Sequence, residues 1–424
     1  KQIARNPERL NEYLGTALFI VMVLIVLTFG AVLGLSFLGP YTPLQIQIIS
    51  LVGFAAFFRV IYTLTTGALG GLERFDLNSI ALTTGRVLFT VVTIGALLIN
   101  RTIYAYVYAV VAVTVFEALL IFGLMWRAIR PRLSINFSLI PSLLRAGVPY
   151  FFSALFFIGY KSFDMIIMSN LIEDSDQLGW YSAADRIFGT LMFIPAILIT
   201  ALFPVLARMH DQESEDLSTY IRKSFSLLFL FSVPIGFGVA SISSQVVTLL
   251  WGPEYANSGL ILMVYGIVIV FTYQTTLLGQ FLVSVDRQNQ WTWVMAIATL
   301  ATFGLDLVLV PLCFHYFGVA GVGGALAYVV TEGGMMLAAI YLLPREYLDR
   351  SNLTVAIRTI LAGLFMVGTV LYLNSIGINL FLQIAGGGAV YLLAILVFRA
   401  IPVEERTLIF NKIMQVLPVG RRGA

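Results

Sequence analysis

The stretch FFIGYKSFDMIIMSN, residues 156–170, places Lys161 and Asp164 inside an otherwise apolar run. With its neighbours, the run approaches the ~20 residues that a helix needs to cross the hydrocarbon core of a bilayer. A charge at that depth costs at least ~2.5–3.5 kcal/mol, so it faces a bundle interior or water. The stretch therefore predicts a membrane-spanning helix that borders a polar interior.

The composition extends this prediction to the whole chain. Hydrophobic residues make up 59% and charged residues 11% of the 424 residues, and the mean hydropathy is +0.93. A soluble protein of this length needs far more charge to cover its surface. We therefore predict an all-α, polytopic membrane protein. One cysteine, Cys313, excludes a disulfide framework, and no side chains have the spacing of a metal site.

Twelve apolar stretches are long enough to be spans, and every connector between them is short. The predicted spans lie at about 16–38, 46–66, 79–99, 103–126, 147–169, 178–206, 224–249, 258–284, 291–314, 318–343, 354–373 and 379–398. Glycines in GVAGVGGALA, residues 318–327, have the spacing of close helix contacts. Four prolines that interrupt spans predict kinks: Pro149, Pro195, Pro234 and Pro311.

Basic residues divide unevenly between the two sets of connectors. If the spans alternate in direction, twenty of the 25 Lys and Arg residues fall on one face together with both termini. The other face has only Arg101 and the acidic connector EDSDQ, residues 173–177. Since basic connectors stay in the cytoplasm, we predict a cell-membrane protein with both termini cytoplasmic.

Two landmarks indicate an internal duplication. The Gly-Pro pairs at 39–40 and 252–253 are 213 residues apart, and so are the acid–Arg pairs at 73–74 and 286–287. Both copies have the same orientation, which predicts a parallel repeat about an axis along the membrane normal.

The second copy has six predicted spans and the first only four. The offset therefore predicts two further helices upstream of Lys1 and a fourteen-span protein in a 6+6+2 plan. A twelve-span protein in a 4+6+2 plan is the alternative. The predicted divisions are an N-terminal lobe at 1–126, a cytoplasmic linker at 127–144, a C-terminal lobe at 145–344, a further helix pair at 353–399 and a cytoplasmic tail at 400–424.

Several runs of residues carry a resemblance to a known family. They are LLRAGVPYFFSALFFIGYKSFDMIIMSNLI (143–172), LGWYSAADRIFGTLMFIPAILITALFPVLARMH (178–210), LWGPEYANSG (250–259) and FGVAGVGGALAYVVTE (317–332). The chain resembles the O-antigen-type polysaccharide-biosynthesis flippases of the multidrug/oligosaccharidyl-lipid/polysaccharide (MOP) exporter superfamily. The resemblance implies two six-helix lobes around a central cavity. It also implies transport of an oligosaccharide on a polyprenyl phosphate or pyrophosphate to the outer leaflet by alternating access.

Nine charged residues lie inside the predicted spans. A flippase for phosphate-linked sugars needs cations along a hydrated path, and arginine binds phosphate bidentately. The predicted substrate-binding residues are Arg186, Arg59, Lys161 and Arg86. Acids within spans can couple transport to H⁺ or Na⁺, and the candidates are Asp306, Glu332, Glu117, Asp164 and Asp185. The alternative is that these charges pair with one another and serve only the packing.

The predicted protein is a transporter rather than an enzyme, with no cofactor and no metal. Its expected partners are the lipid-linked oligosaccharide, the bilayer, H⁺ or Na⁺ and other polysaccharide-assembly membrane proteins, with no nucleic acid. Membrane potential is the alternative driving force, at ~2.3 kcal/mol per charge per 100 mV. A multidrug antiporter of the same superfamily is the closest competing function, although it would favour acids in its cavity. A membrane glycan polymerase or ligase would need a larger outer loop than this chain has.

Overall fold

The computed structural model describes residues 9–39, 41–72, 74–212, 216–344 and 346–400. Every regular element in these ranges is helical, which confirms the all-α prediction. The chain divides into two compact units, residues 1–152 and 153–424. Residues 1–8, and the predicted cytoplasmic tail at 400–424 apart from Ala400, lie outside the described residues.

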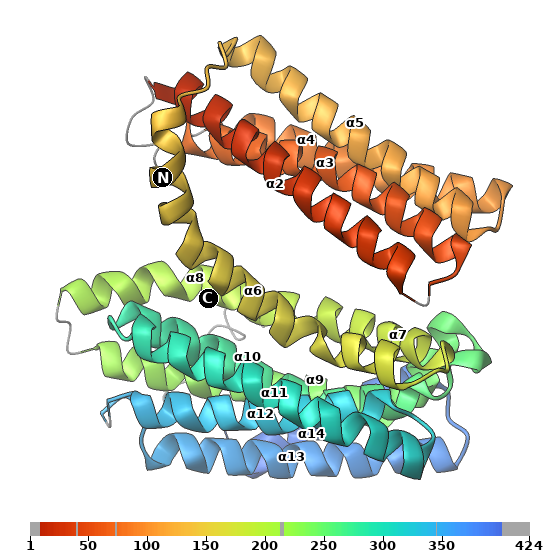
Figure 1. Ribbon diagram of the computed structural model, residues 1–424. Helices are drawn as coiled ribbons and strands as arrows, with labels where there is room; N and C mark the ends of the chain where they lie inside the picture. Colours follow the sequence, from red (N-terminus) through yellow and green to blue (C-terminus); the bar gives the residue numbers. More distant parts are fainter. Residues whose placement is uncertain (1–8, 40, 73, 213–215, 345, 401–424) are drawn as a thin grey trace, which may run out of the picture. The chain divides into compact units, whose positions relative to one another are not determined.

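The first unit is built from four long helices that lie side by side (Figure 1). They are α2 (Leu10–Leu38), α3 (Pro43–Gly71), α4 (Phe75–Ile99) and α5 (Ile103–Ile129). Helix α5 packs against both α3 and α4, and α2 packs against α3. The buried cluster around Leu69, Ile121 and Met125 joins the first turns of α2 and α4 to the last turns of α3 and α5. The core of this unit therefore lies at one end of the bundle.

The chain after α5 is fastened to the start of α2. The backbone N–H of Arg132 donates to the side chain of Asn11 at 2.8 Å, and that of Asn136 donates to the Thr16 hydroxyl at 2.9 Å. Gly15 lets the backbone of Ser134 approach closely, because a Cβ there would lie 2.5 Å from the Ser134 carbonyl oxygen. The predicted linker is thus held by hydrogen bonds on α2.

The second unit surrounds one central helix. Its elements follow a short turn η2 (Phe137–Leu139), and the division between the units falls inside α6. They are α6 (Ile140–Leu171), α7 (Asp176–Leu191), α8 (Phe193–Asp211), α9 (Leu217–Trp251), η3 (Pro253–Tyr255), α10 (Ser258–Ser284), α11 (Gln288–Phe317), α12 (Gly321–Leu342), α13 (Arg350–Ser375) and α14 (Leu380–Val397). Helix α10 packs against α7, α8, α9 and α12, and its Tyr265, Tyr273 and Phe281 are fully buried.

Within the described ranges, eleven helices are long and apolar enough to cross a membrane. The chain is therefore a multi-pass membrane protein. These helices coincide with eleven of the twelve predicted spans, and the remaining one, predicted at 147–169, lies within α6.

The predicted span at 178–206 contains a break that the hydropathy pattern does not show. Helix α7 ends at Leu191 and α8 begins at Phe193. Pro195 explains this break, because proline has no N–H and its ring collides with the carbonyl group four residues earlier, which is that of Leu191. The other interrupting prolines lie inside helices that continue past them: α6, α9 and α11.

The positions of the helix ends support the internal repeat. Three pairs of helices end 213 residues apart: at Leu38 and Trp251, at Gly71 and Ser284, and at Ile129 and Leu342. Helices α4 and α11 begin with the same offset. Helices α2 to α5 therefore correspond, in their order along the chain, to helices α9 to α12.

Glycines allow close contacts between helices of the second unit. A Cβ on Gly266 would lie 2.4 Å from the carbonyl oxygen of Gly236, and one on Gly236 would lie 2.3 Å from that of Gly266. Within the run at 318–327, a Cβ on Gly323 would lie 2.3 Å from the carbonyl oxygen of Leu309. The close contacts predicted for that run are present.

Polar contacts attach α13 and α14 to α9. At one end, Arg222 pairs with Asp349 at 2.9 Å, and at the other, the side chain of Gln245 donates to Asn374 at 2.6 Å. Between them, the Tyr391 hydroxyl donates to the carbonyl oxygen of Leu230. Hydrogen bonds from the Ser351 hydroxyl and Arg222 lower the pKa of Asp349 to about 2. The predicted further helix pair is therefore attached to α9 at three places along its length.

A charged cavity as the candidate functional site

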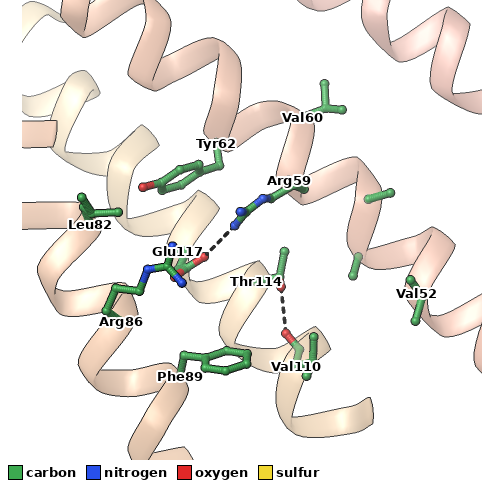
Figure 2. Close-up of a pocket in the computed structure, with 12 residues that line it drawn as sticks. Val52, Arg59, Val60, Tyr62, Leu82, Arg86, Phe89, Val110, Thr114 and Glu117 are labelled. Atoms are coloured by element: carbon green, nitrogen blue, oxygen red, sulfur yellow. Dashed lines mark hydrogen bonds and ion pairs between the residues drawn. The ribbon is translucent and has the colours of Figure 1, made fainter. Parts of the chain in front are cut away.

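Helices α3, α4 and α5 line an open cavity of about 480 Å³ at their middle turns (Figure 2). Three charged side chains line it, namely Arg59 from α3, Arg86 from α4 and Glu117 from α5. Most other lining residues are apolar, among them Val52, Ala55, Ala56, Val60, Leu82, Phe89 and Val110. Three of the nine predicted site residues are thus brought together at one place.

Arg59 makes two contacts at this cavity. Its guanidinium lies 3.4 Å from the carboxylate of Glu117 and 5.6 Å from the centre of the Tyr62 ring. A strong charge-assisted hydrogen bond is shorter, about 2.7–2.9 Å. The side chain of Arg59 is 61% exposed, whereas that of Glu117 is 14% exposed. The ion pair expected under the packing alternative is therefore present, but it leaves most of Arg59 open to a ligand.

Glu117 occupies a place that the backbone of α4 provides. A Cβ on Gly85 would lie 2.2 Å from its carboxylate oxygen, so any other residue at 85 would displace the Glu117 side chain. Arg86 is the next residue, and Figure 2 shows the side chains of Arg59 and Arg86 both extending toward Glu117. Two cations and one carboxylate give the cavity a formal net charge of one positive unit.

The second copy of the repeat has no charge at the three equivalent positions. With the 213-residue offset, the positions equivalent to Arg59, Arg86 and Glu117 are Thr272, Thr299 and Val330. The buried acids of α10 to α12, Asp306 and Glu332, lie at other positions. The packing of these helices therefore does not require a charge at the three equivalent positions.

Predicted acids of the second unit form a buried polar network. The hydroxyl of Tyr181 and the backbone N–H of Met165 both donate to Asp164. Glu332 accepts hydrogen bonds from the hydroxyls of Tyr160, at 2.9 Å, and Thr275, at 2.5 Å. These contacts connect α6 with α7 and connect α12 with α6 and α10.

Asp306 differs from these acids. It is fully buried in α11, and neither carboxyl oxygen accepts a hydrogen bond from the described part of the chain. A buried carboxylate without a partner is strongly unfavourable, so this carboxyl group is stable when it carries a proton or lies beside a cation. No group of three or more His, Cys, Asp or Glu side chains suited to a metal ion occurs among the described residues.

The remaining predicted residues are Lys161 on α6 and Asp185 and Arg186 on α7. All three are exposed.

Sequence reasoning missed the residues that position these charges. Gly85, Tyr62, Tyr160 and Tyr181 carry no formal charge and do not stand out in an apolar helix. A signal was nevertheless present, because Tyr62 follows Arg59 by three residues and so shares its helical face.

Comparison with known proteins assigns this architecture to a family. A family model described as "Polysaccharide biosynthesis protein" matches residues 13–260, which is more than half of the chain. The chain belongs to the polysaccharide biosynthesis protein family. This result confirms the resemblance seen in the sequence.

A curated relative of this family member is the probable low-salt glycan biosynthesis flippase Agl15 of Haloferax volcanii. The two are 23% identical over 268 residues, which are 61% of this chain and 54% of the relative. The chain therefore spans about half the length of the curated relative that it matches.

Two groups of solved structures share the fold. The lipid II flippase MurJ in its inward closed conformation matches with a TM-score of 0.74 and 15% identity, over 91% of this chain and 83% of that chain. An inward-facing multidrug resistance MATE family transporter of the MOP superfamily matches with a TM-score of 0.65 and 15% identity, over 80% and 82%. The family member therefore has the MOP superfamily fold.

Proposed function

We propose that this protein is a flippase that moves a polyprenyl-(pyro)phosphate-linked oligosaccharide from the cytoplasmic to the outer leaflet by alternating access. The observation that carries the proposal is the cavity with Arg59, Arg86 and one carboxylate inside a membrane-spanning bundle. The family and the flippases among the similar proteins support it. The protein is then a transporter of the cell membrane, and the distribution of Lys and Arg supports cytoplasmic termini.

The chemistry of the cavity suits an anion in transit. A phosphate group that leaves bulk water needs new hydrogen-bond donors in place of its hydration shell. Each guanidinium offers five N–H donors in a planar fork that matches phosphate oxygens. Two opposite charges 4 Å apart attract by ~4 kcal/mol at an effective dielectric constant near 20, compared with ~1 kcal/mol in water. Apolar walls around two arginines therefore strengthen the attraction for a headgroup.

Reconstitution tests this function. Purified protein in liposomes should move a fluorescent prenyl-linked oligosaccharide between leaflets, measured as a change in its accessibility to a membrane-impermeant quencher. Protein-free liposomes give the background rate. If neither a phosphate-linked nor a pyrophosphate-linked substrate moves while cationic dyes are extruded, the protein is a multidrug antiporter instead.

Asp306 is the coupling residue in this proposal. Its carboxyl oxygens have no hydrogen-bond partner in the described residues, whereas Asp164 and Glu332 already accept hydrogen bonds from hydroxyl groups. Uptake of H⁺ or Na⁺ by Asp306 would remove an unfavourable buried charge. Glu117 is engaged with Arg59, and Asp185 is exposed, so both are weaker candidates.

Replacing Asp306 with asparagine is expected to abolish the stimulation of transport by an imposed H⁺ or Na⁺ gradient. The substitution preserves the shape of the side chain and removes its charge. Transport driven by membrane potential alone should persist, so initial rates are compared with each driving force applied separately. Glu254→Gln in the turn η3 serves as the matched control. A gradient response in Asp306→Asn equal to that of the wild type would contradict the assignment.

A further inference from the structure

We propose that Glu117 makes the cavity selective for a single negative charge, so the preferred carrier linkage is a phosphodiester of a polyprenyl monophosphate rather than a pyrophosphate. This inference rests on the proposed flippase function. It concerns only the bond between lipid and sugar, and it assigns to Glu117 the role of a specificity-determining residue.

The formal charges at the cavity favour a linkage with a single negative charge. Arg59 and Arg86 contribute two positive charges, and Glu117 contributes one negative charge. A sugar attached to a prenyl lipid through one phosphate carries one negative charge, whereas a pyrophosphate linkage carries two. One charge matches the net charge of the cavity, and a second would lie beside the carboxylate of Glu117. Like charges placed together at an interface are strongly unfavourable and exclude the wrong partner.

The side chain of Glu117 lies close to the backbone of α4. Its side chain is largely buried, and one carboxylate oxygen fills the space that any side chain at residue 85 would need. Its 3.4 Å contact with Arg59 is loose enough for a phosphate oxygen to bind the same guanidinium. An arriving headgroup therefore meets two arginines with the carboxylate still in place.

The internal repeat has an uncharged residue at the equivalent position, and its acid Glu332 lies two residues further along α12. Val330 is the residue at the position equivalent to Glu117, so this place in the helix packing accepts an uncharged side chain. A carboxylate in a cavity for anions weakens the attraction for every anion. Its presence is understandable if it discriminates between anions of different charge.

The test uses two substrates with the same prenyl chain and the same sugar that differ only in having one or two phosphates. Wild-type protein in liposomes is expected to move the monophosphate form at least about tenfold faster than the pyrophosphate form. A tenfold difference in rate requires only part of the free-energy cost that is typical of two like charges in contact. Glu117→Gln keeps the shape and removes the charge, so it is expected to accelerate the pyrophosphate form by about the same factor.

A second variant displaces the carboxylate of Glu117 without removing its charge. Gly85→Ala places a methyl group where the carboxylate oxygen lies, so it should move Glu117 aside and shift the preference in the same direction. Asp76→Asn is the matched control, because Asp76 is also paired with an arginine, Arg74, at 2.9 Å but lies outside the cavity. Thermal unfolding in detergent confirms that each variant is folded.

The outcomes distinguish this inference from the proposed function. If the wild type moves neither substrate, the flippase function is wrong and the inference falls with it. If the wild type moves both substrates equally, or prefers the pyrophosphate, the flippase function stands and the inference is overturned. An unchanged preference in both Glu117→Gln and Gly85→Ala would also overturn it.

Discussion

Replacing Arg86 with glutamine is expected to lower the rate of translocation by about 10- to 100-fold, the range of one lost hydrogen bond to a charged group. The physical reason is the charge of the cavity, which Arg59, Arg86 and Glu117 set together. Without Arg86, the carboxylate of Glu117 cancels the charge of Arg59, and the cavity no longer attracts an anion. The rate is measured in liposomes with the labelled oligosaccharide substrate.

Arg101→Gln is the control for this prediction. Arg101 is exposed between α4 and α5 and does not line the cavity, so its replacement should leave the rate within about twofold, as expected for a screened surface charge. If Arg86→Gln transports as fast as Arg101→Gln, the cavity is not on the path of the substrate.

Gly266→Val is expected to have the largest effect on stability. Its Cβ would lie 2.4 Å from the carbonyl oxygen of Gly236, which is backbone and cannot rotate away. The contact between α9 and α10 would have to open, at a cost at or above the ~1–3 kcal/mol of ordinary overpacking. A drop in the midpoint of thermal unfolding in detergent, together with loss of monodisperse protein, is the expected result.

Gly304→Ala provides the comparison, because no heavy atom lies within 4 Å of a Cβ at that position. The alanine is expected to leave stability unchanged or slightly raise it, since alanine favours helix over glycine by about 1 kcal/mol. Equal stability of Gly266→Val and Gly304→Ala would show that α9 and α10 do not approach as closely as described.

Most of the fold could be predicted from the sequence because a bilayer imposes a length and a polarity on every span. The repeat could also be predicted, since landmarks and helix ends share one offset. The break between α7 and α8 could not be seen in hydropathy, because it depends on the stereochemistry of Pro195 rather than on its polarity.

The candidate site was predictable only in part. Charges inside apolar spans are conspicuous, so Arg59, Arg86 and Glu117 could all be named. The contact between them could not be predicted, because Arg59 and Glu117 are 58 residues apart and their contact depends on the rotation of α3 relative to α5. The nine charges were predicted as one set. The structure brings three of them together within α3 to α5 of the first unit, and within the second unit it shows Asp164 and Glu332 in buried hydrogen bonds.

Accessibility of a cysteine in the cavity tests the central claim, that the arginines there contact an anionic headgroup. Cys313 is the single cysteine of the sequence and is buried, so Cys313→Ala gives a suitable background. Thr114 lines the cavity and its hydroxyl donates to the carbonyl oxygen of Val110 in its own helix, so Thr114→Cys changes little else. We predict that an anionic, membrane-impermeant thiol reagent labels this cysteine and that prenyl-phosphate-linked oligosaccharide slows the labelling. Absence of labelling, or labelling at the same rate with and without the substrate, would contradict the claim.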